Sequence, residues 1–372
     1  MALTIFLTGA TGYIGGQVLS ELLASRKSQY KVTALVRGEE RAAKLRDLGV
    51  ETIIGSLDDT NLLSKASSQA NIVIHTADAD HPGSATAIVN GLLQTAYASE
   101  RKIFIHTSGT GGISDNAKGA YTSDKIYSDL NVDDIKALPD KAIHRNVDLI
   151  VSAVGADPSN YITTAIIMPP TIYGIGAGPF NKLSIQIPEV IRFGIQHRKI
   201  YIPFEGIKRQ EIQKRKIGIQ HRKIYIPFEG ENIWSSIHIK DLGRAYIHLL
   251  DKLIENKEYP ALGMKGYDGY YFAENGEFQW RQIFEKVAQL LHKKGLVDDE
   301  NVQSITFEQQ VETLFNGICN GLPGQAVYLL WGSNSRSKAE RLRMLGWKPT
   351  EKESVFDTIA DETDAIRNKI QA

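Results

Sequence analysis

The sequence of 372 residues has only one cysteine, Cys319, so it can form no internal disulfide and offers no cysteine cluster for a metal. Neither sign of charge is in excess, because 43 Lys and Arg residues balance 43 Asp and Glu residues. This balance argues against nucleic acid and against an anionic membrane surface as partners. No apolar run approaches the ~20 residues that cross a bilayer. We therefore expect no metal site and no membrane partner.

The amino terminus also lacks room for a targeting segment, since the first expected strand begins almost at Met1. Together with the single cysteine, this predicts a cytoplasmic protein in a reducing compartment. Apolar residues make up 42% of the chain and charged residues 23%, as in ordinary globular proteins with a large core. At this length we expect one folding unit with two lobes.

The strongest pattern lies in the first sixteen residues. Leu3, Ile5 and Leu7 alternate as in a short strand, and a helical apolar pattern starts directly after the glycines at 9, 12 and 15. A strand, a glycine-rich turn and a helix in this order can hold a phosphate, because the helix N-terminus offers free N–H groups and a partial positive charge. The glycines let the pyrophosphate of a dinucleotide approach the backbone closely. The residues expected to bind it are Gly9, Thr11, Gly12, Tyr13, Ile14 and Gly15.

The end of the second expected strand, at residues 31–36, decides between the two nicotinamide cofactors. An acidic residue there binds the ribose 2′-hydroxyl of NAD, whereas an arginine accommodates the 2′-phosphate of NADP. The chain has Arg37 at this position and Arg41 one turn later. The sequence therefore favours NADP(H) over NAD(H). The alternative is that Arg37 is a solvated loop residue.

Strands and helices alternate regularly over the first hundred residues, with further strands expected at 51–54, 71–75 and 102–106. Connections of this length require a parallel sheet with helices on both faces, and they place the ligand site beyond the carboxyl ends of the strands. The predicted fold is α/β, a Rossmann doubly wound parallel sheet with a smaller C-terminal substrate lobe. The loop after residue 54 would cover the adenine, where Leu57 supplies an apolar face and Ser56 a hydrogen bond.

We assign residues 1–175 to the NAD(P)-binding Rossmann domain and residues 176–372 mainly to the substrate-binding lobe, with 231–255 returning to the Rossmann sheet. The lobe contains a repeat, because residues 194–206 recur unchanged at 218–230. Two copies cannot form a solenoid, which needs three or more units. Residues 194–217 are therefore interpreted as a duplicated insertion that carries no chemistry.

Several segments together resemble the extended short-chain dehydrogenase/reductase superfamily, of the NAD-dependent epimerase/dehydratase type. They are Thr-Gly-Ala-Thr-Gly-Tyr-Ile-Gly-Gly at 8–16, His-Thr-Ser-Gly at 106–109, Pro-Pro-Thr-Ile-Tyr-Gly at 169–174, and the stretches 55–58, 75–77 and 234–241. Within the superfamily, the sequence is most similar to the NmrA-like and the aldehyde- or carbonyl-reductase-like branches. The resemblance implies that residues 169–174 lie along the nicotinamide. The further cofactor contacts that it implies are Thr76, Ala77, Thr107, Pro169 and Ile172.

In that family a Ser or Thr after the fifth strand polarises the substrate oxygen, a Tyr donates the proton, and a Lys four residues later lowers the tyrosine pKa. The chain contains one Tyr-x-x-x-Lys, Tyr121 to Lys125. Tyr121 follows Ser108 by only 13 residues, and Lys125 precedes Pro169 by 44, and both separations are unusual for the family. Ser108 is also followed by Gly109, where relatives have a second serine.

Two interpretations of the catalytic residues stay open. In the first, an insertion brings Tyr121 and Lys125 into the site by an unusual route. In the second, counting back from Pro169 places His144 at the tyrosine position and Asp148 at the lysine position. His144 is then either a substitute proton donor, which suits the chemistry of an imidazole, or an ordinary helix residue.

The predicted function is an NADP(H)-dependent oxidoreductase that moves a hydride between the nicotinamide and a small carbonyl or aldehyde. One alternative is a nucleotide-sugar epimerase or dehydratase, for whose diphosphate only Arg192, Arg198 and Arg222 are candidate partners. Another is a non-catalytic NADP-binding sensor or regulatory protein, which the displaced catalytic motifs favour. The expected partner is a small-molecule substrate, and a homodimer is left open.

Overall fold

The computed structural model describes residues 2–26, 29–97, 100–157, 159–196, 224–255, 266–305, 308, 315, 321 and 323–371. Its centre is a seven-stranded sheet in the order β11-β7-β5-β4-β1-β2-β3, in which all neighbouring strands are parallel. The strands are β1 (Leu3–Thr8), β2 (Tyr30–Val36), β3 (Glu51–Ile54), β4 (Ile72–His75), β5 (Lys102–Thr107), β7 (Ile162–Met168) and β11 (Tyr270–Phe272). This order confirms the predicted doubly wound α/β fold.

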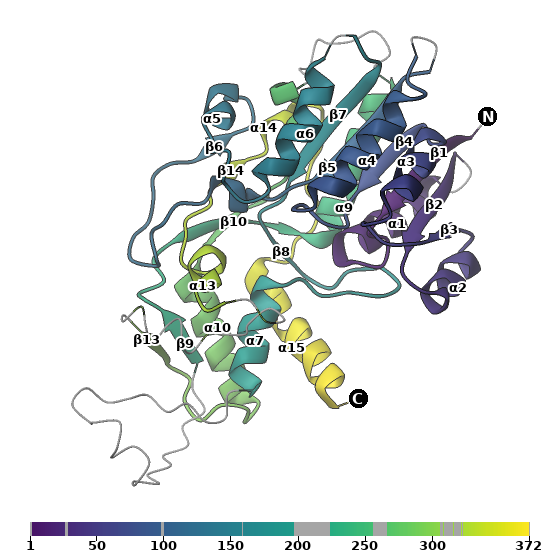
Figure 1. Cartoon of the computed structure of the whole chain (residues 1–372). Coiled ribbons are helices and arrows are strands. Elements are labelled where there is room, and N and C mark those ends of the chain that lie inside the picture. The colour runs from purple at the N-terminus through teal and green to yellow at the C-terminus, as the bar shows by residue number, and fades with distance from the viewer. Residues whose placement is uncertain are drawn as a thin grey trace, which may run out of the picture.

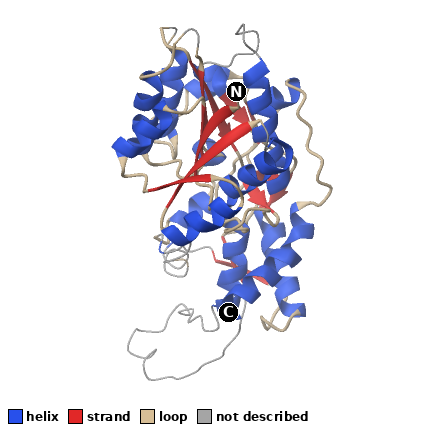
Figure 2. Cartoon of the chain, turned by 90° about the vertical axis from the view of Figure 1, so that its right-hand side faces the viewer, coloured by secondary structure: helices blue, strands red, loops and turns tan. Residues whose placement is uncertain are grey.

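Helices cover both faces of this sheet, as Figures 1 and 2 show. α3 (Thr60–Ser68), α4 (Pro82–Leu93) and α6 (Arg145–Ala156) lie side by side on one face. α1 (Tyr13–Arg26) and α9 (Ile239–Glu255) pack together on the other, and α2 (Glu39–Asp47) lies beside the edge strand β3. Because both faces are covered, every residue of β4, β5 and β7 is buried.

A second lobe has a hydrophobic core of its own. Its main helices are α7 (Gln186–Gln196), α10 (Trp280–Lys293) and α15 (Val355–Gln371), which pack against one another below the sheet in Figure 1. Trp280, Phe284, Phe315 and Trp331 form edge-on ring contacts in this core. The shorter elements of the lobe are β9 (Ile224–Pro227), β13 (Val302–Ile305), which pairs with β9, and α13 (Ala326–Leu330).

The chain passes between the lobes more than once. β8 (Thr171–Tyr173) leaves the large sheet and pairs in parallel with β10 (Ile233–His238), whose other neighbour is the antiparallel β12 (Glu277–Gln279). After β10, α9 returns to pack on α1. β11 then joins the edge of the large sheet, and Leu342 and Trp347 belong to its core. The boundaries assigned from the sequence stay a prediction, and residues 197–217 of the proposed insertion lie outside the described part of the chain.

The remaining elements of the described chain are short. They are η1 (Thr110–Ile113), β6 (Tyr127–Ser128), α5 (Val132–Lys136), η2 (Gly266–Gly269), β14 (Ser337–Lys338) and α14 (Glu340–Met344). β6 and β14 pair with each other, so the segment after β5 is tied to a segment two hundred residues later. This contact holds the chain between β5 and α6 against the second lobe.

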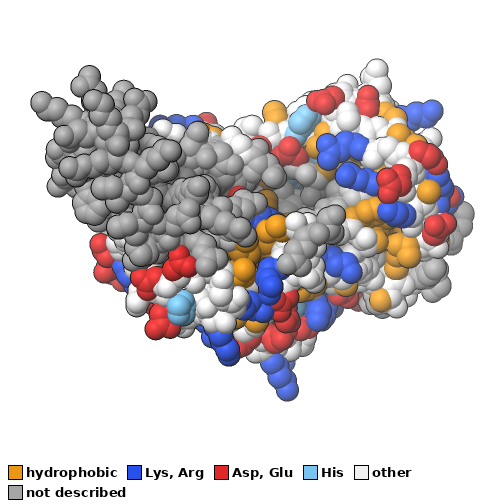
Figure 3. Space-filling view, turned by 90° about the horizontal axis from the view of Figure 1, so that it is seen from below, with side chains coloured by type: hydrophobic (Ala, Val, Ile, Leu, Met, Phe, Trp, Pro, Cys, Tyr) orange, Lys and Arg blue, Asp and Glu red, His pale blue; other side chains and the backbone are white. Residues whose placement is uncertain are grey.

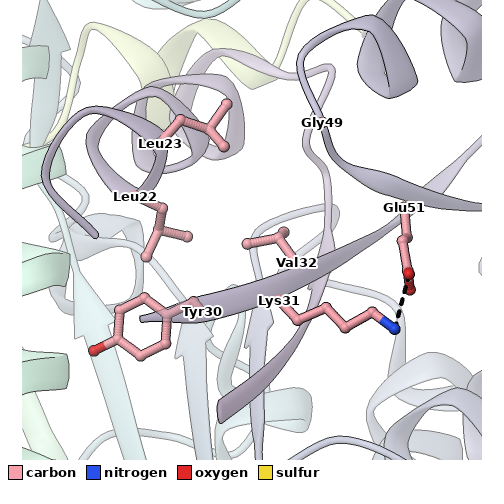
Figure 4. Close-up of a pocket in the computed structure, with 7 residues that line it drawn as sticks. All are labelled: Leu22, Leu23, Tyr30, Lys31, Val32, Gly49 and Glu51. Carbon is pink, nitrogen blue, oxygen red and sulfur yellow. Dashed lines mark ion pairs between the residues drawn. The ribbon is translucent and has the colours of Figure 1, made fainter. Parts of the chain in front are cut away.

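The surface and the pockets give little functional signal by themselves. Acidic and basic side chains are interspersed on the face seen from below (Figure 3), in keeping with the balanced charge. No helix among the described residues is long and apolar enough to cross a membrane. A pocket of about 290 Å³ lies between α1 and the first residues of β2 and β3, beside the Lys31–Glu51 ion pair (Figure 4). It is therefore at the amino ends of the strands, away from the carboxyl ends where ligands bind in this fold.

Candidate active site at the carboxyl ends of the strands

Gly9 and Gly15, at the two ends of the turn between β1 and α1, have no room for side chains. A Cβ on Gly9 would lie 2.5 Å from Oγ1 of Thr76 and 2.8 Å from the backbone N of Ala77, and one on Gly15 would overlap the carbonyl of Gly9. The backbone is thus bare where the first N–H groups of α1, which lack an intrahelical partner, point out of the helix. This arrangement fits the pyrophosphate of a dinucleotide, and we call residues 9–15 the phosphate cradle. Thr11, Gly12 and Ile14 are half-buried at its tip.

A segment from the second half of the chain covers one side of the phosphate cradle. The Tyr13 hydroxyl donates to the carbonyl oxygen of Gly174 at 2.6 Å, and burial raises the pKa of Tyr13 well above its usual value. A Cβ on Gly178 would lie only 2.8 Å from the Cα of Gly16. The Tyr13 side chain therefore holds the segment after β8 against the phosphate cradle. From the sequence, we expected Tyr13 to bind the cofactor.

The end of β2 carries an arginine that is free to meet a ligand. Arg37 is exposed, and within the described residues it makes no ion pair. The acidic side chains that follow it are already neutralised, because Glu39 pairs with Arg46 and Glu40 pairs with Lys44. The guanidinium of Arg37 can therefore bind an anionic group without breaking an ion pair with a described residue.

The next loops flank the phosphate cradle. Ser56 accepts the N–H of Asp58 through Oγ at 3.2 Å, and Leu57 packs at the edge of the large core. Thr76 donates its hydroxyl to the carbonyl of Thr8 at 2.8 Å, whereas Ala77 is exposed. The cofactor contacts expected from the sequence at these positions lie at the ends of β3 and β4, where a dinucleotide would cross the sheet.

The predicted contacts near the nicotinamide are more deeply buried. Thr107 shares a hydrogen bond of 2.6 Å with the hydroxyl of Tyr246. The carbonyl of Pro169 accepts the N–H of Thr110 at 3.0 Å, and Ile172 stands opposite Ile237 in the pairing of β8 with β10. These contacts fix the backbone beyond β5 and β7, and the Thr107 side chain is engaged within the protein.

His144 stands at the start of α6 with its imidazole held by a carboxylate. Its Nδ1 lies 2.9 Å from Oδ1 of Asp80, and its backbone N–H donates to the same oxygen at 3.0 Å. The hydrogen bond to His144 lowers the pKa of Asp80, so Asp80 is ionised and acts only as an acceptor. The backbone of His144 is left-handed, with φ of 69°, which is uncommon for a residue with a side chain. Asp80 therefore fixes both the backbone and the ring.

The free edge of the His144 ring faces the end of β5. A Cβ on Gly109 would lie 3.1 Å from Nε2 of His144. The family pattern has a second serine where this chain has Gly109, and the His144 imidazole lies against that glycine. The missing serine and the histidine counted to the tyrosine position are therefore neighbours. The His144 side chain is 18% exposed, so it is not sealed within the core.

One turn further along α6, Asp148 meets Ser108. The Ser108 hydroxyl donates to Oδ2 of Asp148 at 2.9 Å, and both residues are buried. Burial raises the pKa of Asp148 to about 7, against the opposing effect of the Ser108 hydrogen bond. His144 and Asp148 therefore both lie beside the end of β5, and their places in the family pattern stay a prediction.

The structure places Tyr121 and Lys125 in a different environment. The Tyr121 side chain is 49% exposed, and its carbonyl accepts the side-chain N–H of Asn334. Lys125 pairs with Asp134 at 2.6 Å and lies over the ring of Tyr127. The described contacts of this pair are with the second lobe and α5, whereas those of Ser108 and His144 are with α6 and Asp80.

Asp80 is the residue of this site that the sequence reasoning missed. It lies 64 residues before His144 and follows β4 in the run Asp78-Ala79-Asp80-His81. A signal was present, since polar residues after a strand of a doubly wound sheet lie at the edge where ligands bind. No local spacing links such a residue to a particular histidine on a later helix.

One group of described side chains has atoms close enough to hold a metal, namely His238, Glu351 and Glu353. Glu351 is already bound to Arg244 at 2.6 Å, and Nδ1 of His238 accepts the backbone N–H of Lys240. The group is thus explained as a link between α9 and the segment before α15.

Comparison with known proteins agrees with this geometry. A family of NAD(P)H-binding domains matches residues 9–138. The chain is 29% identical to the protein called oxidase ucsJ from Acremonium sp over 363 residues, which cover 94% of this chain and 93% of that one.

Solved structures of low sequence identity share the fold. The dTDP-glucose 4,6-dehydratase from Bacillus anthracis superposes with a TM-score of 0.62 at 12% identity, over 100% of this chain and 98% of that one. The UDP-glucuronic acid 4-epimerase from Bacillus cereus gives 0.58 at 15% identity, over 99% and 100%. Residues 9–138 thus match a family of NAD(P)H-binding domains, and the chain as a whole shares the fold of these dehydratase and epimerase structures.

Proposed function

We propose that the protein is an NADP(H)-dependent oxidoreductase that exchanges a hydride between the nicotinamide and a small carbonyl or aldehyde, with His144 as the proton donor and acceptor. The observation that carries the proposal is the Asp80–His144 pair, whose free ring nitrogen faces Gly109 at the end of β5. An imidazole oriented by a carboxylate is a recurrent device for proton transfer. The substrate oxygen would lie beside Nε2.

The choice of NADP(H) rests on the end of β2. Bound in the phosphate cradle, the cofactor supplies or accepts the hydride. Arg37 is exposed, and the two acidic side chains next to it are paired elsewhere, so its charge is available for a 2′-phosphate. An Arg37→Ala variant should weaken NADPH binding and leave NADH binding nearly unchanged, as measured by the change in nicotinamide fluorescence. Equal losses for both cofactors would contradict this assignment.

Redox chemistry agrees with the name of the relative that the chain matches over nearly its full length, an oxidase at 29% identity. The solved neighbours named for sugar nucleotides share the fold at 12% to 15% identity, which carries no argument on the substrate. Sugar-nucleotide epimerisation or dehydration, and cofactor binding without catalysis, are therefore outcomes that the experiment must separate from carbonyl reduction.

The decisive experiment incubates the purified protein with NADPH and a panel of small ketones and aldehydes, and follows the loss of nicotinamide absorbance. We expect turnover by the native protein and a loss of about 10²-fold to 10⁴-fold in kcat for His144→Gln, with NADPH affinity unchanged. Tyr121→Phe serves as the matched control and should retain turnover. The opposite result, activity that depends on Tyr121 and survives His144→Gln, would restore the first interpretation of the motifs. NADPH binding without turnover would favour a sensor.

A further inference from the structure

A buried carboxyl group, Asp148, lies behind the strand end that carries Ser108. Its Oδ2 accepts the Ser108 hydroxyl, but its Oδ1 has no hydrogen-bond partner. Neither ring nitrogen of His106 has one either, and Nε2 of His106 lies 3.8 Å from that same oxygen. Asp148 is 2% exposed and His106 is 0% exposed. Unsatisfied polar atoms this deep in a protein are rare and call for a functional explanation.

The position of Asp148 relates it to the candidate proton donor. Asp148 follows His144 by four residues, and its backbone N–H donates to the carbonyl of His144 at 3.0 Å, so the two residues stand one turn apart at the start of α6. The His144 ring lies against Gly109, and the Asp148 carboxyl binds Ser108, which directly precedes Gly109. The two side chains therefore contact adjacent residues at the end of β5. Ser108 carries a hydroxyl, which Gly109 lacks.

We propose that Asp148 is a positioning residue whose protonation decides whether the Ser108 hydroxyl is available to a substrate oxygen. A carboxylate only accepts hydrogen bonds, so ionised Asp148 accepts the hydrogen bond of the Ser108 hydroxyl. That hydroxyl hydrogen is then not available to a substrate. A carboxylic acid donates, so protonated Asp148 can bind Oγ of Ser108 and release the Ser108 hydrogen toward the site. The proton is exchanged with solvent, and no covalent bond to carbon changes. The role in catalysis rests on the proposed function, whereas the proton switch itself does not.

The groups around Asp148 allow this change near neutral pH. Burial raises the pKa of Asp148 to about 7, His144 and Arg145 on the same helix lower it, and Asp80 raises it. From β5, burial lowers the pKa of His106 well below its usual value, so the His106 ring is neutral. From β11, the pKa of Tyr270 is raised by burial and by Asp148. The 3.8 Å contact of His106 with Asp148 is therefore not an ion pair in either protonation state of Asp148.

The neutral form of Asp148 is also compatible with the sheet beneath it. His106 stacks on His75 at 5.4 Å between ring centroids, and burial lowers the pKa of His75 to about 4. Both imidazoles are therefore neutral, and neither supplies a cation that would hold Asp148 ionised. A small movement that closes the 3.8 Å gap would give Oδ1 the hydrogen bond it lacks.

The first test observes the proton on Asp148 by infrared spectroscopy of the whole protein between about pH 5 and about pH 9. The carboxylic acid band that disappears in Asp148→Asn identifies Asp148, while the bands of buried Glu362 and Asp129 remain as internal controls. We expect the Asp148 band to fade as the pH rises through about 7. In Ser108→Ala the midpoint should move to higher pH by about one unit, because the carboxylate loses a hydrogen-bond donor.

The second test uses the carbonyl that gives turnover. The ratio of native kcat to Ser108→Ala kcat should fall about tenfold from about pH 6 to about pH 8 as Asp148 ionises, because any pH dependence from the rest of the site is common to both proteins. The ratio of Asp148→Asn kcat to Ser108→Ala kcat should not change with pH, because an amide donates to Ser108 at every pH. The Asn variant keeps the shape of the side chain, and Ser108→Ala removes a single oxygen, so both variants should fold.

Either of two results overturns the proposal. One is an infrared spectrum in which Asp148→Asn removes no pH-dependent acid band, or in which Ser108→Ala leaves the midpoint unchanged. The other is a ratio of native kcat to Ser108→Ala kcat that does not change with pH. Absence of turnover in the native protein contradicts the proposed function instead, and the infrared midpoints still decide whether Asp148 switches Ser108.

Discussion

At the scale of single residues, the site depends on a histidine in an uncommon backbone conformation. His144 has a left-handed backbone, which costs on the order of 1 kcal/mol or more for a residue with a side chain. Asp80 offsets this cost by accepting hydrogen bonds from both the backbone N–H and Nδ1 of His144. The same carboxylate thus stabilises the strained start of α6 and aims the ring at Gly109.

Asp80→Asn should therefore impair the reaction more than it impairs cofactor binding. An amide can still meet one of the two donors, but it carries no charge to stabilise a protonated imidazole. We expect kcat to fall about 10-fold to 100-fold, less than in His144→Gln, with little change in NADPH affinity. Steady-state kinetics and a fluorescence titration of the same preparation measure the two effects. A loss confined to NADPH affinity would show that Asp80 belongs to the cofactor site.

Restoring the serine of the family pattern at position 109 should harm this protein. The Cβ of Gly109→Ser would stand 3.1 Å from Nε2 of His144, and its hydroxyl would need further space. The imidazole must then turn away from the strand end, so we expect turnover to drop at least tenfold. Gly83→Ser is the matched control, because a Cβ there meets only the His81 ring at 3.4 Å. Higher activity in Gly109→Ser would mean that the hydroxyl, not the ring, limits the reaction.

The residues of this site differ in how far the sequence could reveal them. His144 and Asp148 could be reached by counting back from Pro169, because one helix and one strand separate them and both have predictable lengths. Asp80 could not, since its contact with His144 spans 64 residues and depends on how β4 and β5 sit side by side. The assigned roles of Tyr121, Lys125 and His144 stay predictions.

At the scale of elements, the C-terminal helix carries a buried acid that links the lobes. Oε1 of Glu362, on α15, accepts the backbone N–H of Gly174 at 2.8 Å, next to the Gly174 carbonyl that holds Tyr13. Oε2 of Glu362 has no hydrogen-bond partner. Burial raises the pKa of Glu362 to about 7. The contact between α15 and the segment beside the phosphate cradle is therefore sensitive to pH.

Glu362→Gln should change how stability depends on pH. Because the pKa of Glu362 is raised in the folded state, the folded protein binds more protons than the unfolded chain between about pH 4.5 and about pH 7. Its contribution is thus lost as the pH rises through this window, by up to about 3 kcal/mol, and levels off above it. The variant should lack this slope in urea unfolding at a series of pH values. An unchanged slope would show that Glu362 titrates normally.

Local patterns in the sequence predicted most elements of the sheet but not every neighbour. The glycine turn and the alternation of strands and helices predicted the parallel strands from β1 to β5, since crossovers of this kind have one hand. Nothing in the sequence near β11 showed that this strand would join the sheet edge beside β7. That pairing joins segments a hundred residues apart and follows from the packing of the two lobes.

At the scale of the whole molecule, the repeat in the second lobe can be tested by removal. Deleting residues 194–217 joins Phe193 to Gly218, and the sequence that follows is identical to the one removed. The end of α7 already lies against β9, because the Ile224 side chain fills the space that a side chain on Gly194 would need. The shortened connection would leave three residues between α7 and β9, a normal length for such a loop.

We expect the shortened protein to fold, to bind NADPH with native affinity and to melt at a temperature close to that of the full chain. Circular dichroism and a fluorescence titration measure these properties. A deletion of the same length in the helical core, such as residues 280–303 across α10, is the contrasting control and should prevent folding. A shortened chain that does not fold would show that residues 194–217 belong to the architecture of the lobe.

The hydrogen bond between Asp80 and Nδ1 of His144 has a consequence for the direction of the reaction. Because the carboxylate holds the hydrogen on Nδ1, the neutral ring presents a lone pair at Nε2, and only the imidazolium presents a hydrogen there. The neutral tautomer can then remove a proton from an alcohol, and the charged ring can give one to a carbonyl. Oxidation and reduction would therefore use the same ring nitrogen in opposite roles, as the acceptor of the alcohol proton and as the donor to the carbonyl oxygen.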